Sequence, residues 1–127
     1  VRGTLKKGFE LYQALEHPFA KSLFMLFMVS EVHPFNDGNG RISRIMMNAE
    51  LVAADQSKII IPTVYREDYL NALRRLTRRG DPSVLIRAIS RVRQFSANIV
   101  GDDFEKSREY LEKCNAFKDG EGYILRF

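Results

Sequence analysis

Apolar residues in this chain recur at steps of three and four, and this helical spacing constrains the fold more than any other feature. Near the N-terminus Leu5, Phe9, Tyr12 and Leu15 follow it, so they predict one buried face of a first helix. Further helical patterns cover residues 19–31, 41–54, 66–79, 82–98 and 104–116. Only residues 58–61 have strand-like composition, and a single strand cannot form a sheet, so they are interpreted as a connector. The sequence predicts an all-α fold.

The pattern over residues 19–31 is apolar on nearly every side, which is typical of a central, buried helix. We expect Phe24, Phe27 and Met28 on its inner side. Pro18 separates it from the first helix, because proline lacks an amide hydrogen and disfavours helical geometry in the residue before it. The tail, residues 117–127, predicts a turn and a short hairpin arm.

The segment between the second and third predicted helices is rich in residues that bind phosphate. Gly38, Asn39 and Gly40 directly precede a helix, where backbone amides lack intrahelical partners and carry a partial positive charge. Glycines let such amides approach a ligand closely, so the three residues predict an anion cradle. Arg41 and Arg44 follow three residues apart, on one side of that helix, and arginine forms forked hydrogen bonds to phosphate oxygens.

Two further side chains complete a set suited to nucleoside triphosphate chemistry. Asp37 is a hard carboxylate directly before the cradle, where a Mg²⁺ ion that bridges two phosphates needs a ligand. His33 lies at the entrance of the loop, and imidazole suits a general base that removes a proton from an attacking hydroxyl. Base, metal ligand, amide cradle and two arginines together indicate transfer to or from a nucleoside triphosphate.

The same residues resemble a known family signature. The run His33-Pro-Phe-Asn-Asp-Gly-Asn-Gly-Arg-Ile-Ser-Arg44 matches the Fic signature, His-Pro-Phe-x-Asp/Glu-Gly-Asn-Gly-Arg-x-x-Arg, at every defined position. The resemblance extends over about residues 5–92. It implies an all-α, Fic-type helical bundle with the active-site loop between two central helices. It also implies a protein adenylyltransferase, which moves AMP from Mg-ATP onto a Ser, Thr or Tyr hydroxyl of a target protein.

The resemblance implies a role for each matched position. His33 would be the general base, Phe35 would anchor the loop in the core, and Asp37 would bind Mg²⁺. The remaining loop residues would hold phosphates: Gly38, Asn39 and Gly40 the α- and β-phosphates, Arg41 and Arg44 the β- and γ-phosphates. The adenine would face three residues of a later helix: Leu70, Leu73 and Thr77.

The family pattern also shapes the expected organisation and partners. Residues 1–98 would form the catalytic core, with its upstream part missing since Val1 is not a start methionine, and residues 99–127 a C-terminal helix and tail. Between Val1 and Lys7 there is little room for the family's β-hairpin flap, so the flap would either belong to the missing upstream region or be lacking in this member. Ser107 and Glu112 are one residue too far apart for its inhibitory helix motif, so an inhibitory helix or antitoxin would come from outside this chain.

An internal control accompanies the motif. The triplet His17-Pro18-Phe19 repeats His-Pro-Phe, but Ala20-Lys21-Ser22 follows it in place of the acid and the glycines. His17 is therefore interpreted as a helix-boundary residue. A lone His before Pro is usually structural, and only the second triplet carries the full motif.

Composition leaves three alternatives to adenylyl transfer. Relatives that transfer phosphate or phosphocholine depart from the Gly-Asn-Gly-Arg positions, which are intact here. A catalytically silent nucleotide-binding adaptor is disfavoured by the intact His33. The net charge of +4, the pI of about 9.4 and the cluster of Arg74, Arg75, Arg78 and Arg79 suit nucleic acid, but no recognition motif supports that partner.

The single cysteine, Cys114, excludes an intramolecular disulfide and favours a reducing, cytoplasmic setting. The longest apolar run, residues 23–29, is too short to span a bilayer, so no membrane partner is expected.

Overall fold

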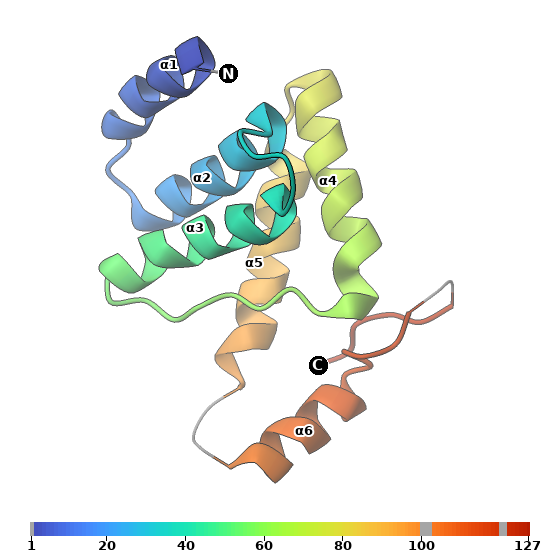
Figure 1. Ribbon diagram of the computed structural model, residues 1–127. Coiled ribbons are helices and arrows are strands. Elements are labelled where there is room, and N and C mark those ends of the chain that lie inside the picture. The colour runs from blue at the N-terminus through green and yellow to red at the C-terminus, as the bar shows by residue number, and fades with distance from the viewer. Residues whose placement is uncertain (1, 100–102, 120–121) are drawn as a thin grey trace. The chain divides into compact units, whose positions relative to one another are not determined.

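The computed structural model describes residues 2–99, 103–119 and 122–127, and in these residues it contains six α-helices and no strand (Figure 1). The predicted all-α class is confirmed. The chain divides into two compact units, Val1–Lys58 and Ile59–Phe127. Within the described residues no helix combines the length and the apolar character needed to cross a membrane.

The first unit consists of α1 (Arg2–Gln13), α2 (Pro18–Val32) and α3 (Asn39–Ala53). Helices α2 and α3 lie side by side and antiparallel, and α1 contacts α2 (Figure 1). The α2–α3 pair buries one face of each helix, and its fully buried apolar side chains are Leu26, Met47 and Leu51. Residues 33–38 connect the two helices, so the motif loop lies at one end of this helical hairpin.

Helix α2 does not bury the side chains that its composition suggested. Ser22, Leu26 and Val29 are the buried positions. The predicted inner residues, Phe24, Phe27 and Met28, are only half-buried. An apolar residue on every side leaves the sequence without a polar face to orient the helix, which explains the wrong prediction.

The predicted buried face of α1 is also wrong. Phe9 exposes 59% of its surface, and Tyr12 and Leu15 are only half-buried; the Leu5 side chain lies outside the described part. Among the α1 residues whose burial is described, Gly8 is the buried one, and an added Cβ there would overlap the Met28 side chain. The helix therefore approaches α2 through a glycine, which a count of apolar residues cannot detect.

The second unit contains the 3-10 turn η1 (Thr63–Tyr65) and three helices, α4 (Arg66–Arg79), α5 (Ser83–Ala97) and α6 (Phe104–Lys113). Helices α4 and α5 pack as a second antiparallel hairpin (Figure 1). Gly80 ends α4 in the left-handed conformation, with φ of 65°, as glycine at this position permits.

Helix α5 starts one residue later than the predicted range of 82–98, with Pro82 as its N-cap. The Ser83 amide donates to the Asp81 carboxylate over 3.0 Å, and α5 begins one residue after Pro82. Hydrogen bonding from Ser83, first from its side chain and then from this amide, lowers the pKa of Asp81 below its ordinary value, with smaller contributions from the charges of Arg75 and Arg87.

The C-terminal tail returns to the body of the second unit. Phe95, fully buried on α5, stacks on Tyr110 with ring centroids 5.7 Å apart and meets the edge of Phe127 at 5.8 Å. The Arg126 amide donates to the Cys114 carbonyl over 3.1 Å. No strand forms in the described tail, so the predicted hairpin arm is not observed there, and the predicted turn at residue 120 lies outside the described residues.

Candidate active site

The motif loop begins at the last residues of α2 and ends at the first residues of α3. Within the first unit this places two helix ends beside each other: the C-terminus of α2, with unpaired carbonyls, and the N-terminus of α3, with unpaired amides. The structure brings His33, Asp37 and the Gly38–Arg41 turn together in this one loop and helix start.

His33 is held in a defined orientation. It is the C-cap of α2 in the left-handed conformation, with φ of 52° and ψ of 56°. Its Nδ1 lies 2.8 Å from the Ser30 carbonyl oxygen. A carbonyl oxygen can only accept, so Nδ1 carries the proton of the neutral ring and Nε2 keeps its lone pair. The side chain is exposed, which leaves Nε2 in the state and position that a general base requires.

The Asn39 side chain closes the loop. Its Oδ1 accepts from the Phe35 amide over 3.1 Å, and its Nδ2 donates to the Phe35 carbonyl over 2.8 Å. Asn39 is 5% exposed, so both ends of its amide are satisfied inside the protein. The side chain of Asn39 is therefore occupied. Its backbone amide is the group that stays available for the predicted contact with phosphate.

The start of α3 presents amides without a side-chain cap. Gly38 is the N-cap with φ of 76°, a left-handed conformation that strains residues with a Cβ, and no side chain caps this helix end. The first helical hydrogen bond runs from the Ile42 amide to the Gly38 carbonyl over 2.9 Å. The amides of Asn39, Gly40 and Arg41 precede it, so they have no intrahelical partner at the turn where the sequence predicts an anion cradle.

The fold tolerates a side chain at position 40, unlike at Gly38, whose backbone is left-handed. A Cβ at Gly40 would stand 3.7 Å from Arg44 Nη1, an ordinary van der Waals contact. Glycine inside a helix costs about 1 kcal/mol relative to alanine, so the local packing gives no reason to retain it. A ligand that approaches the backbone closely is the remaining physical reason for a glycine at position 40.

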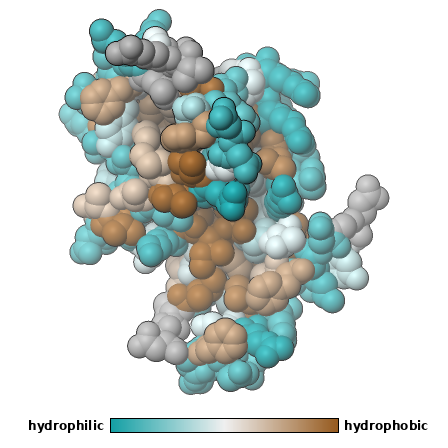
Figure 2. Space-filling model, viewed as in Figure 1, coloured by the Kyte–Doolittle hydropathy of each residue, from teal (hydrophilic) through white to brown (hydrophobic). Residues whose placement is uncertain are grey.

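Arg41 and Arg44 stand beside the cradle and keep their charges available. Arg41 Nη2 lies 4.0 Å from Asp37 Oδ2, with the two side chains 75% and 95% exposed, so this ion pair is weak. Both arginines line a groove of about 590 Å³ that continues along α3 past Ile45 and Val52. Ile45 and Val52 are exposed apolar side chains. In the view of Figure 2, hydrophobic residues lie among hydrophilic ones at the surface.

Asp37 is the residue that could hold a metal ion. Its Oδ1 accepts from the Gly38 amide over 2.7 Å, and its Oδ2 is nearly free of protein contacts. No three His, Cys, Asp or Glu side chains gather anywhere among the described residues. A single carboxylate fits Mg²⁺ at a nucleotide site, because this ion commonly takes its other ligands from phosphates and water.

The loop and its flanking helices match a known family. Residues 3–51 match the sequence model of the Fic/DOC family. Over these residues the chain is similar to the Fic/DOC family. The match contains α2, the motif loop and most of α3, so it covers the first unit's hairpin and the site described above.

Curated relatives carry the same family name. The chain is 35% identical over 79 residues to "Protein adenylyltransferase Fic" of Drosophila willistoni, and 36% identical over 74 residues to the proteins of that name in Drosophila persimilis and Drosophila grimshawi. These matches cover 58–62% of this chain but only 14–16% of the relatives. The chain thus spans about one sixth of their length. No solved structure matches it.

One family-based expectation within the loop is wrong. Phe35 was expected to anchor the loop in the core, but it is 52% exposed. Its backbone, held by Asn39, fixes the loop instead of its ring. Asn39 bonds to the backbone of Phe35, four residues earlier. Such a contact produces no repeating pattern in the sequence, so only the folded loop reveals it.

The expected adenine-facing residues lie in the second unit. Leu70, Leu73 and Thr77 follow one face of α4, where the two leucines are half-buried and Thr77 is exposed. Their contact with adenine stays a prediction.

The four arginines of α4, which the sequence presents as one basic cluster, differ in their surroundings. The structure separates Arg75, which lines a cleft against α5, from Arg74, which donates to Asn71 over 2.8 Å. Arg87 and Arg91, four apart on α5, face the same cleft, and their helical spacing was the signal that sequence reasoning missed.

Proposed function

We propose that this chain is the motif-bearing part of a protein adenylyltransferase that transfers AMP from Mg-ATP to a hydroxyl of a target protein. The orientation of His33 carries the proposal: Nδ1 is committed to the Ser30 carbonyl, and Nε2 is open beside an uncapped helix N-terminus. A base beside an anion cradle is the arrangement that nucleophilic attack on a bound phosphate requires. The name of the Drosophila relatives, protein adenylyltransferase, agrees with this chemistry.

The proposed reaction is an in-line displacement at the α-phosphorus. A new bond joins the target oxygen to the α-phosphorus, and the bond from the α-phosphorus to the bridging oxygen of the β-phosphate breaks. His33 Nε2 takes the hydroxyl proton, and pyrophosphate leaves with the electron pair. The amides of the Gly38–Arg41 turn and the guanidinium groups of Arg41 and Arg44 stabilise the negative charge of the phosphates. Mg²⁺, held by Asp37, would neutralise part of the charge on the leaving group.

The backbone at Gly40 gives the cradle a separate test. Because an added Cβ would meet only an ordinary contact, Gly40→Ala should leave the fold intact or slightly more stable. The methyl group would stand between the helix N-terminus and a bound phosphate. We expect ATP affinity to fall in calorimetry while the unfolding midpoint stays unchanged or rises; unchanged ATP affinity would argue against phosphate at this turn.

Labelled ATP separates the proposed function from its alternatives. The chain is incubated with a protein extract and ATP labelled at either the α- or the γ-phosphate. Protein-bound label from the α-position alone supports AMP transfer. Label from the γ-position alone identifies a phosphotransferase, and no label from either, with ATP still bound, identifies a silent nucleotide-binding module. The His33→Asn variant controls for label that adheres without transfer.

A further inference from the structure

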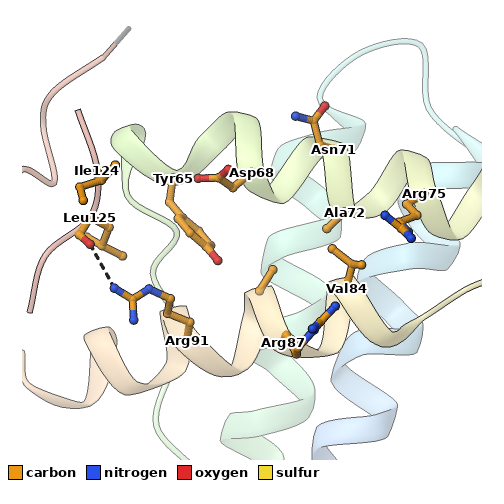
Figure 3. A pocket seen from close by; sticks show the side chains of 11 residues that line it. Tyr65, Asp68, Asn71, Ala72, Arg75, Val84, Arg87, Arg91, Ile124 and Leu125 are labelled. Carbon is orange, nitrogen blue, oxygen red and sulfur yellow. Dashed lines mark hydrogen bonds between the residues drawn. The ribbon is translucent and has the colours of Figure 1, made fainter. Parts of the chain in front are cut away.

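The second unit contains a cleft between α4 and α5 that lies outside the residues matched by the Fic/DOC model (Figure 3). Its volume is about 580 Å³, within the range of about 300–1,000 Å³ that small-molecule sites occupy. The apolar helix residues Ala72, Val84 and Ala88 line it. Tail residues Ile124 and Leu125 lie at one end (Figure 3). Size and lining both suit a small ligand with an apolar part.

The charge of the cleft is positive. Three guanidinium groups, those of Arg75, Arg87 and Arg91, line it against one carboxylate, that of Asp68. Arg75 comes from α4, whereas Arg87 and Arg91 come from α5, so cations face the cleft from both of its walls (Figure 3). Such an arrangement attracts anions of matching size.

The three arginines differ in how far the protein already uses them. Arg91 donates from Nη2 to the Leu125 carbonyl over 3.1 Å and lies 4.7 Å from the centre of the Phe127 ring, so it fastens the tail. Arg75 has a 3.6 Å ion pair with Asp81, in which both side chains are more than a third exposed. Arg87 makes no hydrogen bond within the described part of the chain, and its charge acts on the Asp81 carboxylate. Arg75 and Arg87 are therefore the two available for a ligand.

The end of the cleft near the tail holds Tyr65 and Asp68 together with Arg91 (Figure 3). There the pKa of Tyr65 is raised by burial and, to a lesser extent, by the negative charge of Asp68, while Arg91 acts in the opposite direction. The Tyr65 hydroxyl is therefore protonated at neutral pH and can donate. Arg75 and Arg87 lie away from this group of side chains, toward the other end of the cleft (Figure 3).

We propose that this cleft binds a small organic phosphate monoester, with its phosphate between Arg75 and Arg87 and its apolar body over Ala72, Val84 and Ala88. A phosphate monoester carries a charge of about −1.5 to −2 at neutral pH, more than the single charge of the Asp81 carboxylate with which both guanidinium groups interact. Its three terminal oxygens accept the forked hydrogen bonds that arginine donates. A carboxylate has only two oxygens and one charge to offer the same two arginines.

Phenyl phosphate is a suitable probe, because it joins a phosphate dianion to a flat apolar ring. In titrations of the isotope-labelled chain followed by NMR, we expect saturable shifts of the α4 and α5 amides that line the cleft. Arg87→Gln should weaken binding about tenfold to a hundredfold, as loss of a charge-assisted hydrogen bond does. Arg87 has no hydrogen bond to lose, so this variant should keep the fold. Arg75→Gln should weaken binding similarly.

Arg78→Gln is the matched control, because it removes the same charge from α4 at a position that does not line the cleft. It should bind phenyl phosphate like the parent. The proposal is overturned if shifts saturate only at residues 38–44, if Arg87→Gln and Arg75→Gln bind like the parent, or if Arg78→Gln weakens binding equally. Benzoate tests the charge: affinity equal to that of phenyl phosphate would overturn the choice of a phosphate dianion.

Discussion

The two His-Pro-Phe triplets stand at opposite ends of the same helix, α2. His17 is the N-cap, with an extended backbone of φ −80° and ψ 125°, and Pro18 occupies the first helical position. His33 is the C-cap, with a left-handed backbone. The same three residue types therefore begin a helix in one place and leave it in the other.

The ring of each histidine responds to the helix end that it meets. At an N-terminus the unpaired groups are amides, and His17 Nδ1 accepts from the Phe19 amide over 3.2 Å. At a C-terminus the unpaired groups are carbonyls, and His33 Nδ1 donates to the Ser30 carbonyl over 2.8 Å. The neutral ring of His17 thus keeps its proton on Nε2, whereas that of His33 leaves Nε2 as an acceptor. Helix polarity thus leaves the free ring nitrogen of His17 a donor and that of His33 an acceptor.

The largest expected effect comes from the same substitution made in both triplets. His33→Asn removes the base but keeps a residue that tolerates the left-handed backbone. We expect transfer to fall by at least about a hundredfold, the typical contribution of a general base. ATP affinity should stay within a few-fold, because the base acts on the target hydroxyl. His17→Asn should transfer AMP like the parent.

Transfer is measured as protein-bound label from α-labelled ATP, and ATP affinity by calorimetry. Parent-like transfer by His33→Asn would remove His33 from the mechanism. Equal losses in the two variants would mean that both act through the stability of α2, and the contrast between the triplets would have no chemical meaning.

The next effect concerns the cation downstream of the second triplet. Arg44 stands eleven residues after His33, and Met28 stands eleven after His17, so only the second triplet has a cation there. Arg44→Ala should weaken ATP about tenfold to a hundredfold and AMP much less, because the side chain is expected at the γ end. Arg41→Ala should weaken ADP as well as ATP. Circular dichroism controls for loss of α3.

If Arg44→Ala remains folded and keeps the parent's ratio of ATP to AMP affinity, the triphosphate does not lie along α3. The reversed nucleotide placement of the phosphotransferase relatives would then describe this site better.

A smaller effect should come from the clamp that only the second triplet has. Asn39→Ala leaves the amide and carbonyl of Phe35 without their partner, which we expect to lower the free energy of unfolding by about 1–3 kcal/mol. Transfer should fall with it, because the loop that positions His33 loosens. Asn36→Ala changes the same residue type in the same loop, at an exposed position, and should be near neutral in urea unfolding. Equal stability of the two variants would contradict the clamp.

Most of the helix boundaries could be predicted because local signals fix them. Pro18, Gly80 and Asp81 act on their own backbone or on the next residues, so the ends of α2 and α4 and the start of α5 fall within one residue of expectation. The buried faces of α1 and α2 could not be predicted, because the close contact there is made by Gly8, a residue without a side chain.

The candidate site also combines features that local sequence signals predict with features that they do not. The cradle and the arginines follow from sequence because their spacing relative to a helix start fixes their geometry. The roles of Asn39 and Arg87 depend on side chains meeting backbone or another helix after folding, and no spacing rule encodes that. Phe35 shows the converse: its identity matches the family, but its exposure contradicts the expected burial.

The smallest expected effect concerns the first triplet, in which His17 caps the start of α2. The bond from the Phe19 amide to His17 Nδ1 is exposed and 3.2 Å long, so His17→Ala should cost only about 0.5–1 kcal/mol, the lower part of the range for lost caps. His17→Asn should recover that loss, since asparagine is a preferred N-cap. Hydrogen exchange at the Phe19 amide should accelerate in the alanine variant and return to the parent's rate in the asparagine variant. Asparagine thus rescues the first triplet, where an acceptor is all that the helix end needs, and fails in the second, where the ring must also move a proton. Recovery of transfer by His33→Asn, or no recovery of protection by His17→Asn, would break the assignment of one role to each end of α2.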